Sequence, residues 1–319
     1  MKLTKILNLF KSYYSYLISN VTKNTVRYGH PISISVEPTT NCNLKCPQCP
    51  VGIGNLKRYK GDISIVLFKK IIDQTAPYLL NIFLYFQGEP FLNSNIFRLI
   101  KYANSKNIYT STSTNGHFFT IENCKKIIDS KLDKLIISLD GASQDVYEKY
   151  RVDGNLNSVI SGIKNLVETK KMRNSKIPFI ELQFLVLKSN EHQIDKIKHL
   201  SKNLKVNKLS IKTAQVYNFE NDKLFIPQNL KYTRYKKVDN RWILKKKLKN
   251  KCWRLWNSTV ITWDGEVLPC CFDKDAKYSF GNINEQKLSE IIKNDKFMKF
   301  ANKLLTNRKG IDICSNCSE

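Results

Sequence analysis

Three closely spaced cysteines near the start of this sequence form its clearest chemical pattern. Cys42, Cys46 and Cys49 have the spacing C-x3-C-x2-C and follow a β-type run. Thiolates are soft ligands that suit zinc or iron–sulfur clusters. Three thiolates in one loop can bind three irons of a [4Fe–4S] cluster and leave the fourth iron open to a small chelating molecule. An incomplete zinc site, or three unrelated cysteines, are the alternatives.

A second set of cysteines lies near the end of the chain. It consists of Cys252, Cys270, Cys314 and Cys317. Four thiolates from separated segments can complete a tetrahedral zinc site or a fully ligated [4Fe–4S] cluster. Cys271 could replace Cys270 as a ligand, and Cys124 fits a buried apolar position in a helix. Tight cysteine groups without a secretion signal indicate metal binding rather than disulfides.

The elements that position these residues alternate between strand and helix. β-type runs, most of them rich in Ile, Phe, Leu and Val, occur at Ile32–Val36, Ile82–Phe86, Tyr109–Ser113, Leu135–Leu139, Ile180–Val186 and Lys208–Lys212. Helical patterns lie between them at Ile65–Leu80, Asn95–Lys106, Ile121–Lys131, Leu156–Thr169 and Glu191–Lys202. This alternation predicts an α/β fold with a parallel sheet. Six repeats are too few for an eight-fold barrel, so we expect an open, partial (β/α)6 TIM-like barrel.

Polar and glycine-rich segments follow several of the strands. They are Gln87-Gly88-Glu89-Pro90, Ser113-Thr114-Asn115-Gly116, Ser138-Leu139-Asp140-Gly141 and Tyr150-Arg151. With the C-x3-C-x2-C loop, these segments resemble the radical S-adenosylmethionine (SAM) superfamily. The resemblance implies that Gly88, Glu89, Ser113, Asn115, Ser138 and Arg151 contact SAM. Gln87 replaces the first glycine of the family pattern, and Gln48 replaces an aromatic residue found in many relatives.

The C-terminal cysteines extend this resemblance. Cys252, Gly265 and Cys270 match the C-x12-G-x4-C element of the twitch domain, a shortened SPASM domain. The resemblance implies one auxiliary [4Fe–4S] cluster in a small α+β module, with Cys252, Cys270, Cys314 and Cys317 as ligands. Val260–Leu268 is typical of a hairpin with an Asp-Gly turn, and Glu285–Leu305 of a helix. Structural zinc is the alternative at this site.

The resemblance also implies an activity. A cluster on Cys42, Cys46 and Cys49 would reduce SAM to methionine and a 5′-deoxyadenosyl radical, which removes hydrogen from an organic substrate. Substrates of relatives range from peptides to sugar-like aminocyclitols, so an oxidation or maturation reaction is expected. A reductase or a flavodoxin- or ferredoxin-type protein would donate the electron. Asp140 and Asp273 are conceivable bases, but both suit turns, so no catalytic residue is assigned.

We divide the chain into four parts: an N-terminal basic amphipathic helix (1–31), the barrel (32–222), a basic linker (223–251) and the cluster module (252–319). The linker region suits a solvated segment, a basic helical surface or a docking patch for an acidic partner. The N-terminal segment is too polar to span a bilayer. We expect its helix to cover one end of the main domain, with peripheral membrane contact as the alternative. The expected location is cytoplasmic.

The formal charge of +26 fits compositional drift toward Lys alongside many Ile and Asn, which we favour, and it would also suit nucleic acid, an anionic membrane surface or an acidic substrate. A zinc-dependent, basic nucleic-acid-binding protein would explain the charge and the second cysteine group. It would not explain the polar segments at the strand ends, and no basic stretch contains a base-stacking motif, so nucleic acid is not an expected partner. A second alternative is a non-catalytic scaffold on the same fold, which would bind clusters without cleaving SAM.

Overall fold

The computed structural model describes residues 3–216 and 225–318. By its internal contacts the chain forms two compact units, which we describe separately. The first unit contains Met1–Asn41, Leu56–Thr110 and Leu248–Glu319, and the second contains Cys42–Asn55 and Ser111–Lys247. Each unit therefore combines segments that are distant in the sequence.

The sheet of the first unit is mostly parallel and has the strand order β10-β9-β1-β2. Its strands are β1 (Ser33–Val36), β2 (Asn81–Phe83), β9 (Ser258–Ile261) and β10 (Val267–Leu268). The β9–β10 pair confirms the expected hairpin. β9 also pairs in parallel with β1, from Ser33 opposite Ser258 to Val36 opposite Ile261. The C-terminal hairpin thus extends the sheet that begins with β1.

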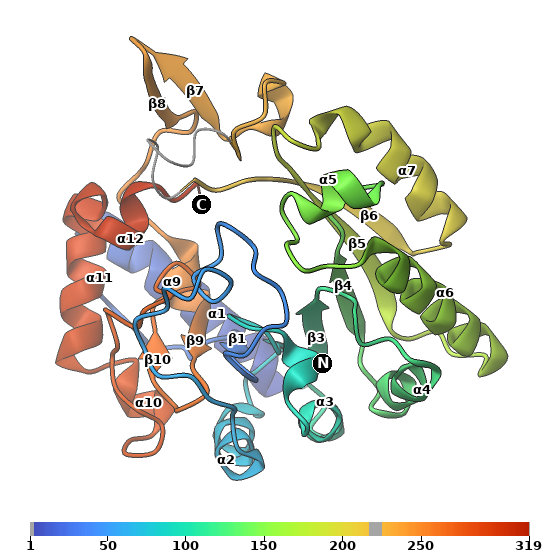
Figure 1. The fold of residues 1–319 in the computed structure, drawn as a ribbon. Helices are drawn as coiled ribbons and strands as arrows, with labels where there is room; N and C mark the ends of the chain where they lie inside the picture. Colours follow the sequence, from blue (N-terminus) through green and yellow to red (C-terminus); the bar gives the residue numbers. More distant parts are fainter. Residues whose placement is uncertain (1–2, 217–224, 319) are drawn as a thin grey trace. The chain divides into compact units, whose positions relative to one another are not determined.

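Helices of the first unit come from both ends of the chain (Figure 1). They are α1 (Leu3–Thr22), α2 (Ile65–Thr75), α3 (Ile96–Ser105), α9 (Trp253–Asn257), α10 (Leu288–Ile291), α11 (Asp295–Asn307) and α12 (Asp312–Ser315). The single helix expected over Glu285–Leu305 is divided into α10 and α11. Asn294 starts the second of these by accepting a hydrogen bond from Phe297 N at 3.0 Å. Within the described residues, no helix is both long and apolar enough to cross a membrane.

The second unit contains the remaining parallel strands, in the order β3-β4-β5-β6. They are β3 (Tyr109–Thr114), β4 (Lys134–Ser138), β5 (Phe179–Val186) and β6 (Lys208–Thr213), and the boundary between the units falls within β3. The helices are α4 (Ile121–Asp129), α5 (Gln144–Glu148), α6 (Leu156–Met172) and α7 (Ile194–Asn203). Side-chain caps fix two helix starts: Thr120 accepts from Asn123 N, and Asn155 accepts from Ser158 N. Strand–helix alternation therefore holds as predicted.

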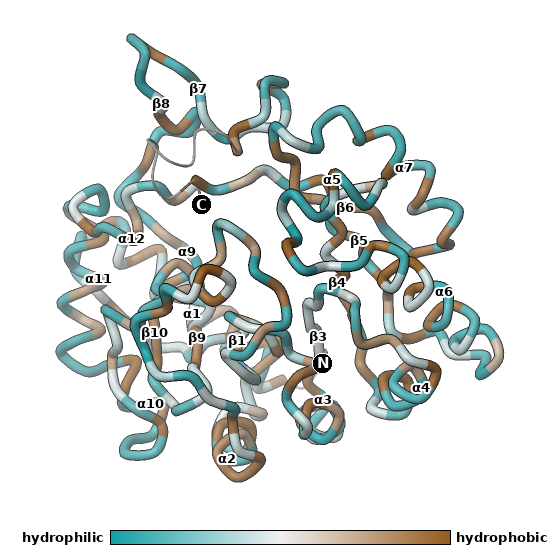
Figure 2. The backbone as a smooth tube through the Cα atoms, in the orientation of Figure 1, coloured by the Kyte–Doolittle hydropathy of each residue, from teal (hydrophilic) through white to brown (hydrophobic). Residues whose placement is uncertain are grey.

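The basic region after β6 forms a hairpin, where a linker or a helical surface was expected. β7 (Tyr235–Val238) and β8 (Arg241–Leu244) pair in an antiparallel manner. Asp239 and Asn240 form the turn, with φ of 45° and 62°. Tyr235, the first residue of β7, is buried, whereas most residues of the hairpin are hydrophilic (Figure 2). Of the alternatives left open for this region, the helical surface is excluded at residues 235–244, where two short strands pair across a tight turn.

Candidate metal centres

The first three cysteines lie in the loop Cys42–Asn55, which belongs to the second unit. Cys49 N donates to Cys46 O at 3.1 Å, so these two residues share one turn. Lys45 N donates to Val152 O at 3.1 Å, which ties the loop to the segment after α5. Cys46 is buried, whereas Cys42 and Cys49 are partly exposed. One loop thus carries three thiols, two of which a ligand can reach from solvent.

Arg151 connects this loop with the end of β4. Its Nε donates to Asp140 Oδ2 at 2.6 Å, and its Nη1 lies 3.8 Å from Cys46 Sγ. Asp140 is held in place by Leu185 N, which donates to Oδ1 at 2.7 Å. Burial raises the pKa of the Cys46 thiol, and the guanidinium of Arg151 opposes that rise. Positive charge beside this sulfur favours the thiolate form that a metal requires.

Asn115 reaches the same loop from the end of β3. Its Nδ2 donates to Asn43 Oδ1 at 2.7 Å, and its Oδ1 accepts from His117 N at 3.2 Å. Ser113 is half-buried in β3, and Ser138 is buried at the end of β4. Because β3 and β4 are parallel neighbours, both serines stand toward the carboxyl ends of their strands. Four of the six residues expected to contact SAM, these three and Arg151, therefore belong to the unit that holds the cysteine loop.

Gly88 and Glu89 belong to the first unit, where they pack on residues that lead into the cysteine loop. Gly88 has φ +72°, and a Cβ there would lie 2.8 Å from Asn41 O. Only glycine fits this position, because both its φ and its closeness to other backbone exclude a side chain. Glu89 N donates to the same carbonyl oxygen at 2.7 Å. The buried Glu89 carboxylate accepts from Phe91 N at 3.2 Å.

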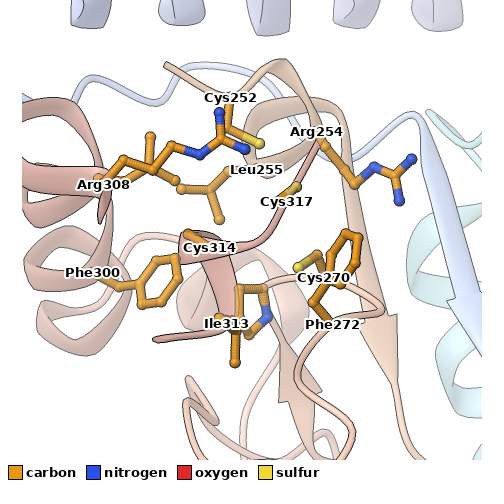
Figure 3. A pocket seen from close by; sticks show the side chains of 12 residues that line it. Cys252, Arg254, Leu255, Cys270, Phe272, Phe300, Arg308, Ile313, Cys314 and Cys317 are labelled. Atoms are coloured by element: carbon orange, nitrogen blue, oxygen red, sulfur yellow. The ribbon is translucent and has the colours of Figure 1, made fainter. Parts of the chain in front are cut away.

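The four C-terminal cysteines line one pocket of the first unit (Figure 3). Cys252 precedes α9, Cys270 follows β10, Cys314 lies in α12, and Cys317 comes shortly after it. The rest of the wall is mainly apolar and includes Leu255, Pro269, Phe272, Phe300, Leu304 and Ile313. Three separate stretches of the chain must therefore fold together before these four sulfurs share a pocket.

Burial raises the pKa of three thiols in this pocket. The pKa of Cys314 rises to about 11, and those of Cys252 and Cys270 also lie above their ordinary value. Such thiols are protonated at neutral pH, whereas a bound metal deprotonates them outright. Among the described residues, no group of three or more His, Cys, Asp or Glu side chains stands ready to hold a metal ion. The fit to a cluster therefore rests on the soft donor set and the apolar pocket.

The structure also distinguishes the two adjacent cysteines. Cys270 lines the pocket, while Cys271 is exposed and accepts a hydrogen bond from Arg254 Nη1 at 3.2 Å. Asp273, one of the conceivable bases, accepts from Lys277 N at 2.9 Å and from Tyr278 N at 2.8 Å. Asp273 thus closes a turn after the cysteine pair, which is the turn role that its residue type suggested in the sequence.

Sequence reasoning did not identify Arg308, which lines the same pocket and is almost fully buried. Its Nη1 donates to Lys251 O at 2.6 Å and to Lys249 O at 3.3 Å. These bonds fix the segment that leads into Cys252. A single arginine at the end of a helix has no spacing or motif that would have identified it.

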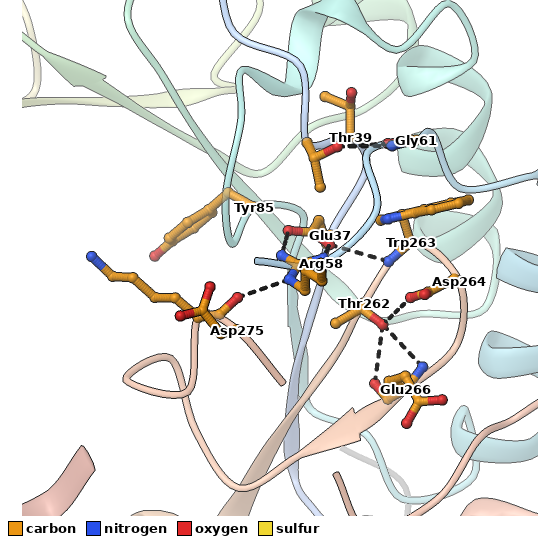
Figure 4. Close-up of polar contacts among 12 residues, drawn as sticks. Glu37, Thr39, Arg58, Gly61, Tyr85, Thr262, Trp263, Asp264, Glu266 and Asp275 are labelled. Carbon is orange, nitrogen blue, oxygen red and sulfur yellow. Dashed lines mark hydrogen bonds and ion pairs between the residues drawn. The ribbon is translucent and has the colours of Figure 1, made fainter. Parts of the chain in front are cut away.

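A buried ion pair links β1 with the loop after Cys270 (Figure 4). Arg58 Nη1 donates to Glu37 Oε2 at 2.7 Å, and Arg58 Nε donates to Lys274 O at 2.8 Å. Trp263 N donates to the same Glu37 oxygen at 3.3 Å. Glu37 is completely buried, so it depends on these donors. This pair, also absent from the sequence predictions, attaches the cysteine module to the first strand.

Comparison with known protein families identifies the family of this chain. The model of the radical SAM superfamily matches residues 36–204, more than half of the 319 residues. The chain belongs to the radical SAM superfamily. A second model, SPASM, described as an iron–sulfur cluster-binding domain, matches residues 252–318 of this radical SAM protein.

Two relatives match the radical SAM protein over most of both chains. A tungsten-containing aldehyde ferredoxin oxidoreductase cofactor-modifying protein of Pyrococcus furiosus is 26% identical, over 89% of this chain and 86% of its own. The S-adenosyl-L-methionine-dependent 2-deoxy-scyllo-inosamine dehydrogenase of Niallia circulans is 24% identical, over 89% of this chain and 92% of its own.

Solved structures support the fold of the radical SAM protein. BtrN in complex with AdoMet and 2-DOIA aligns with a TM-score of 0.54 and 20% identity, over 91% of this chain and 94% of its own. Streptococcus suis SuiB bound to precursor peptide SuiA aligns with a TM-score of 0.64 and 14% identity, over 93% of this chain and 72% of its own. The predicted α/β class is confirmed: a partial barrel with a C-terminal cluster-binding module.

The family assignment confirms the central chemical predictions. The radical SAM protein is an enzyme of the oxidoreductase or maturase type, in preference to the zinc-binding alternative. Its cofactors are SAM, the [4Fe–4S] cluster that binds SAM and an auxiliary iron–sulfur cluster. The assignment covers the superfamily chemistry and leaves the substrate open.

Proposed function

We propose that this enzyme oxidises an alcohol group of a polar small molecule of the sugar or aminocyclitol type. The observation that carries the proposal is the pocket with four cysteines. Four protein thiolates fill the coordination positions of a [4Fe–4S] cluster, which leaves no iron for substrate. Such a cluster is suited to accept an electron. A radical reaction followed by loss of one electron amounts to a two-electron oxidation.

We assign the cofactor sites to this chain's residues as follows. Cys42, Cys46 and Cys49 hold the cluster that binds SAM, while Cys252, Cys270, Cys314 and Cys317 hold the auxiliary cluster. When bound, the first cluster and SAM supply one-electron chemistry that yields methionine and a 5′-deoxyadenosyl radical. Gly88, Glu89, Ser113, Asn115, Ser138 and Arg151 are the proposed contacts to SAM. We place SAM chemistry in 32–222 and the auxiliary cluster in 252–319, with 1–31 and 223–251 outside both.

Individual residues have distinct tasks in this scheme. The buried Glu89 carboxylate suits the ammonium group of SAM, because a carboxylate accepts charge-assisted hydrogen bonds from an ammonium. Arg151 keeps the cysteine loop on the end of β4 through Asp140 and Cys46. Asn115 orients the same loop through Asn43.

The proposed reaction balances without an added oxidant. SAM and a secondary alcohol give methionine, 5′-deoxyadenosine, the corresponding ketone and one proton. The hydrogen atom on carbon would go to 5′-deoxyadenosine and the hydroxyl proton to solvent. The auxiliary cluster, held by its four cysteines, would take up one electron, which equals the electron that starts the reaction, so none is gained or lost overall. A reductase or a flavodoxin- or ferredoxin-type protein supplies the first electron. The Niallia circulans dehydrogenase supports this substrate class because its match covers nearly the whole of both chains. The PqqA peptide cyclase of Bradyrhizobium diazoefficiens matches only 60% of this chain and 49% of its own.

The decisive experiment follows deuterium from substrate to product. The enzyme is reconstituted anaerobically and incubated with SAM, dithionite and alcohols deuterated at their carbinol carbons: 2-deoxy-scyllo-inosamine, myo-inositol and glucosamine. We expect deuterium in 5′-deoxyadenosine, measured by mass spectrometry, for at least one of them. Unlabelled 5′-deoxyadenosine with all three would reject the small-alcohol assignment and leave a peptide substrate.

Two variants control this assay. The C42A/C46A/C49A variant should form no 5′-deoxyadenosine, because it lacks every proposed ligand of the first cluster. C124A should behave as the wild type, since Cys124 is buried in α4 and belongs to neither site. A wild-type enzyme that binds iron yet makes no 5′-deoxyadenosine would be a scaffold rather than a catalyst.

A further inference from the structure

Helix α1 has its polar side buried and its apolar side exposed, the reverse of an ordinary surface helix. Its buried residues are Lys5, Asn8, Ser12, Ser15 and Ser19. Its exposed apolar residues, which we name the α1 outer face, are Leu3, Leu7, Phe10, Tyr14, Leu17 and Val21. These six side chains are between 43% and 82% exposed. The apolar side of α1 therefore faces solvent.

Hydrogen bonds to the following segment fix this orientation. Asn8 and His30 exchange two bonds, His30 N to Asn8 Oδ1 at 2.8 Å and Asn8 Nδ2 to His30 O at 3.1 Å. Ser15 Oγ accepts from Tyr28 N at 2.8 Å, and Ser19 Oγ accepts from Val26 N at 2.8 Å. Rotating the helix to bury its outer face would leave these groups without partners, a large penalty for buried polar atoms.

The residues around the outer face are aromatic. Tyr28 stacks on Tyr14 with ring centroids 6.2 Å apart, and Tyr13 packs edge-on against Trp253 at 5.5 Å. Tyr13 and Tyr28 are themselves about half exposed. Amphipathic aromatic rings of this kind are favoured at the boundary between lipid headgroups and acyl chains.

The charge of this region indicates what the face contacts. Residues 1–36 include five basic and no acidic side chains. Lys5 and Arg27 bind backbone oxygens within the unit, whereas Lys11 and Lys23 are exposed. The 4-3 spacing of the stripe would also allow pairing with a second copy. That pairing would bring lysines together with no acids on either helix, whereas anionic lipid provides the missing negative charge.

We propose that α1 docks this enzyme onto the surface of an anionic lipid bilayer, with its outer face in the interface. The helix lies along the membrane and does not cross it. Its buried polar residues hold it to the protein while its apolar residues enter the lipid. This inference concerns where the enzyme works, and it is independent of the substrate proposed above.

Vesicle flotation tests the proposal. Reconstituted holoenzyme is mixed anaerobically with vesicles of phosphatidylcholine, with or without phosphatidylglycerol. We expect the wild type to float only with phosphatidylglycerol, and more weakly at about 0.5 M than at about 0.1 M salt because screening shortens the reach of Lys11 and Lys23. In L7S/F10S/L17S the bound fraction should fall at least about tenfold, since three side chains no longer enter the lipid.

A matched triple variant tests whether the effect depends on the position of the changes in α1. V66S/I121S/M172S replaces three side chains of similar exposure on α2, α4 and α6, and it should float as the wild type does. Both variants should keep iron content and 5′-deoxyadenosine formation in solution. The proposal fails if the wild type does not float or floats equally on neutral lipid. It also fails if the L7S/F10S/L17S variant floats as well as the wild type does. It also fails if the wild type is a dimer that this variant converts to a monomer.

Discussion

The two cysteine sites are built in opposite ways. Cys42, Cys46 and Cys49 come from one continuous loop, and two of them are partly exposed. The C-terminal site collects cysteines from three stretches of chain around an apolar pocket. Each site has an arginine nearby, but the partly buried Arg151 contacts a cysteine sulfur, whereas the buried Arg308 bonds to backbone leading to a cysteine. The first site is therefore local to one loop, whereas the second is assembled from distant segments around a mainly apolar wall; two cysteines of each site are partly exposed.

Because of this difference, we expect the two sites to contribute differently to catalysis and to the stability of the fold. A loop site with a missing ligand can receive a cosubstrate, and its contacts to the unit do not require metal. A site assembled from distant segments forms only in the folded chain, so its metal contributes directly to folding. We expect losses at the first site to appear mainly as lost turnover. Losses at the second should appear first as lost stability.

The largest effect should follow removal of two proposed ligands of the auxiliary cluster. In C314A/C317A the pocket keeps only two thiols, and we expect iron to fall from about eight to about four per chain. Stability should fall by about 4–5 kcal/mol or more, because buried groups lose the metal that joined them. Iron analysis and anaerobic urea unfolding provide the two measurements.

The loop variant is the comparison that this prediction needs. C42A/C46A/C49A should also lose about four irons, but its stability should change by only about 1 kcal/mol. The loop keeps its bonds to Val152 and Asn115 without metal. Equal destabilisation in both variants would show that the two sites do not differ as described.

A smaller loss should follow when the anchor of the cysteine module is broken. Arg58→Met leaves Glu37 buried without its ion partner, which costs about 3–5 kcal/mol. Burial already holds the pKa of Glu37 above its ordinary value of 4.5, and Arg58 opposes that rise. Without Arg58 the pKa rises further. The carboxyl then binds its proton more tightly in the folded state, so stability falls as pH rises from about 4.5 through the folded-state pKa.

Unfolding measured between about pH 5 and pH 8 tests this sign. The free energy of unfolding should decline more steeply with pH in R58M than in the wild type. E37Q/R58M removes the titrating group, so its curve should run parallel to or flatter than that of the wild type. An R58M curve that rises with pH would show that Glu37 is not desolvated as the structure indicates.

The sequence predicted local features better than assembled ones. The strands β4 and β5 appeared as short runs rich in Ile, Leu, Phe and Val, because burial on a parallel sheet demands such runs, whereas β3 consists of Tyr, Thr and Ser. The cysteine loop could also be recognised, because its three cysteines are close together in the sequence. The pairing of β9 with β1 joins residues more than two hundred positions apart, and no local pattern encodes it. Arg308 bonds to Lys251 O, 57 positions earlier, and Arg58 bonds to Lys274 O, 216 positions later, so no local spacing identifies either arginine.

Replacing Arg151 tests the site in the cysteine loop without removing a cysteine. Arg151→Met removes the positive charge beside Cys46 Sγ, and we expect 5′-deoxyadenosine formation to fall about 10- to 100-fold. The reduction potential of the SAM-binding cluster should become more negative, as followed by anaerobic EPR titration, while the auxiliary cluster is unchanged. Lys45→Met is the control, because it removes an exposed loop cation whose pair with Asp153 is worth little. If both variants behave alike, Arg151 has no special relation to the cluster.

The smallest expected effect separates two neighbouring cysteines. Cys271→Ser should keep the wild-type iron content and change stability by no more than about 0.5 kcal/mol, because its side chain is exposed and bonded to Arg254. Cys270→Ser should lose auxiliary iron, since Cys270 lines the pocket with the other three ligands. Iron analysis with EPR of the auxiliary cluster distinguishes the variants. The reverse result would mean that metal binding turns this segment so that Cys271 replaces its neighbour, and the assembled site would then be less fixed than its apolar wall suggests.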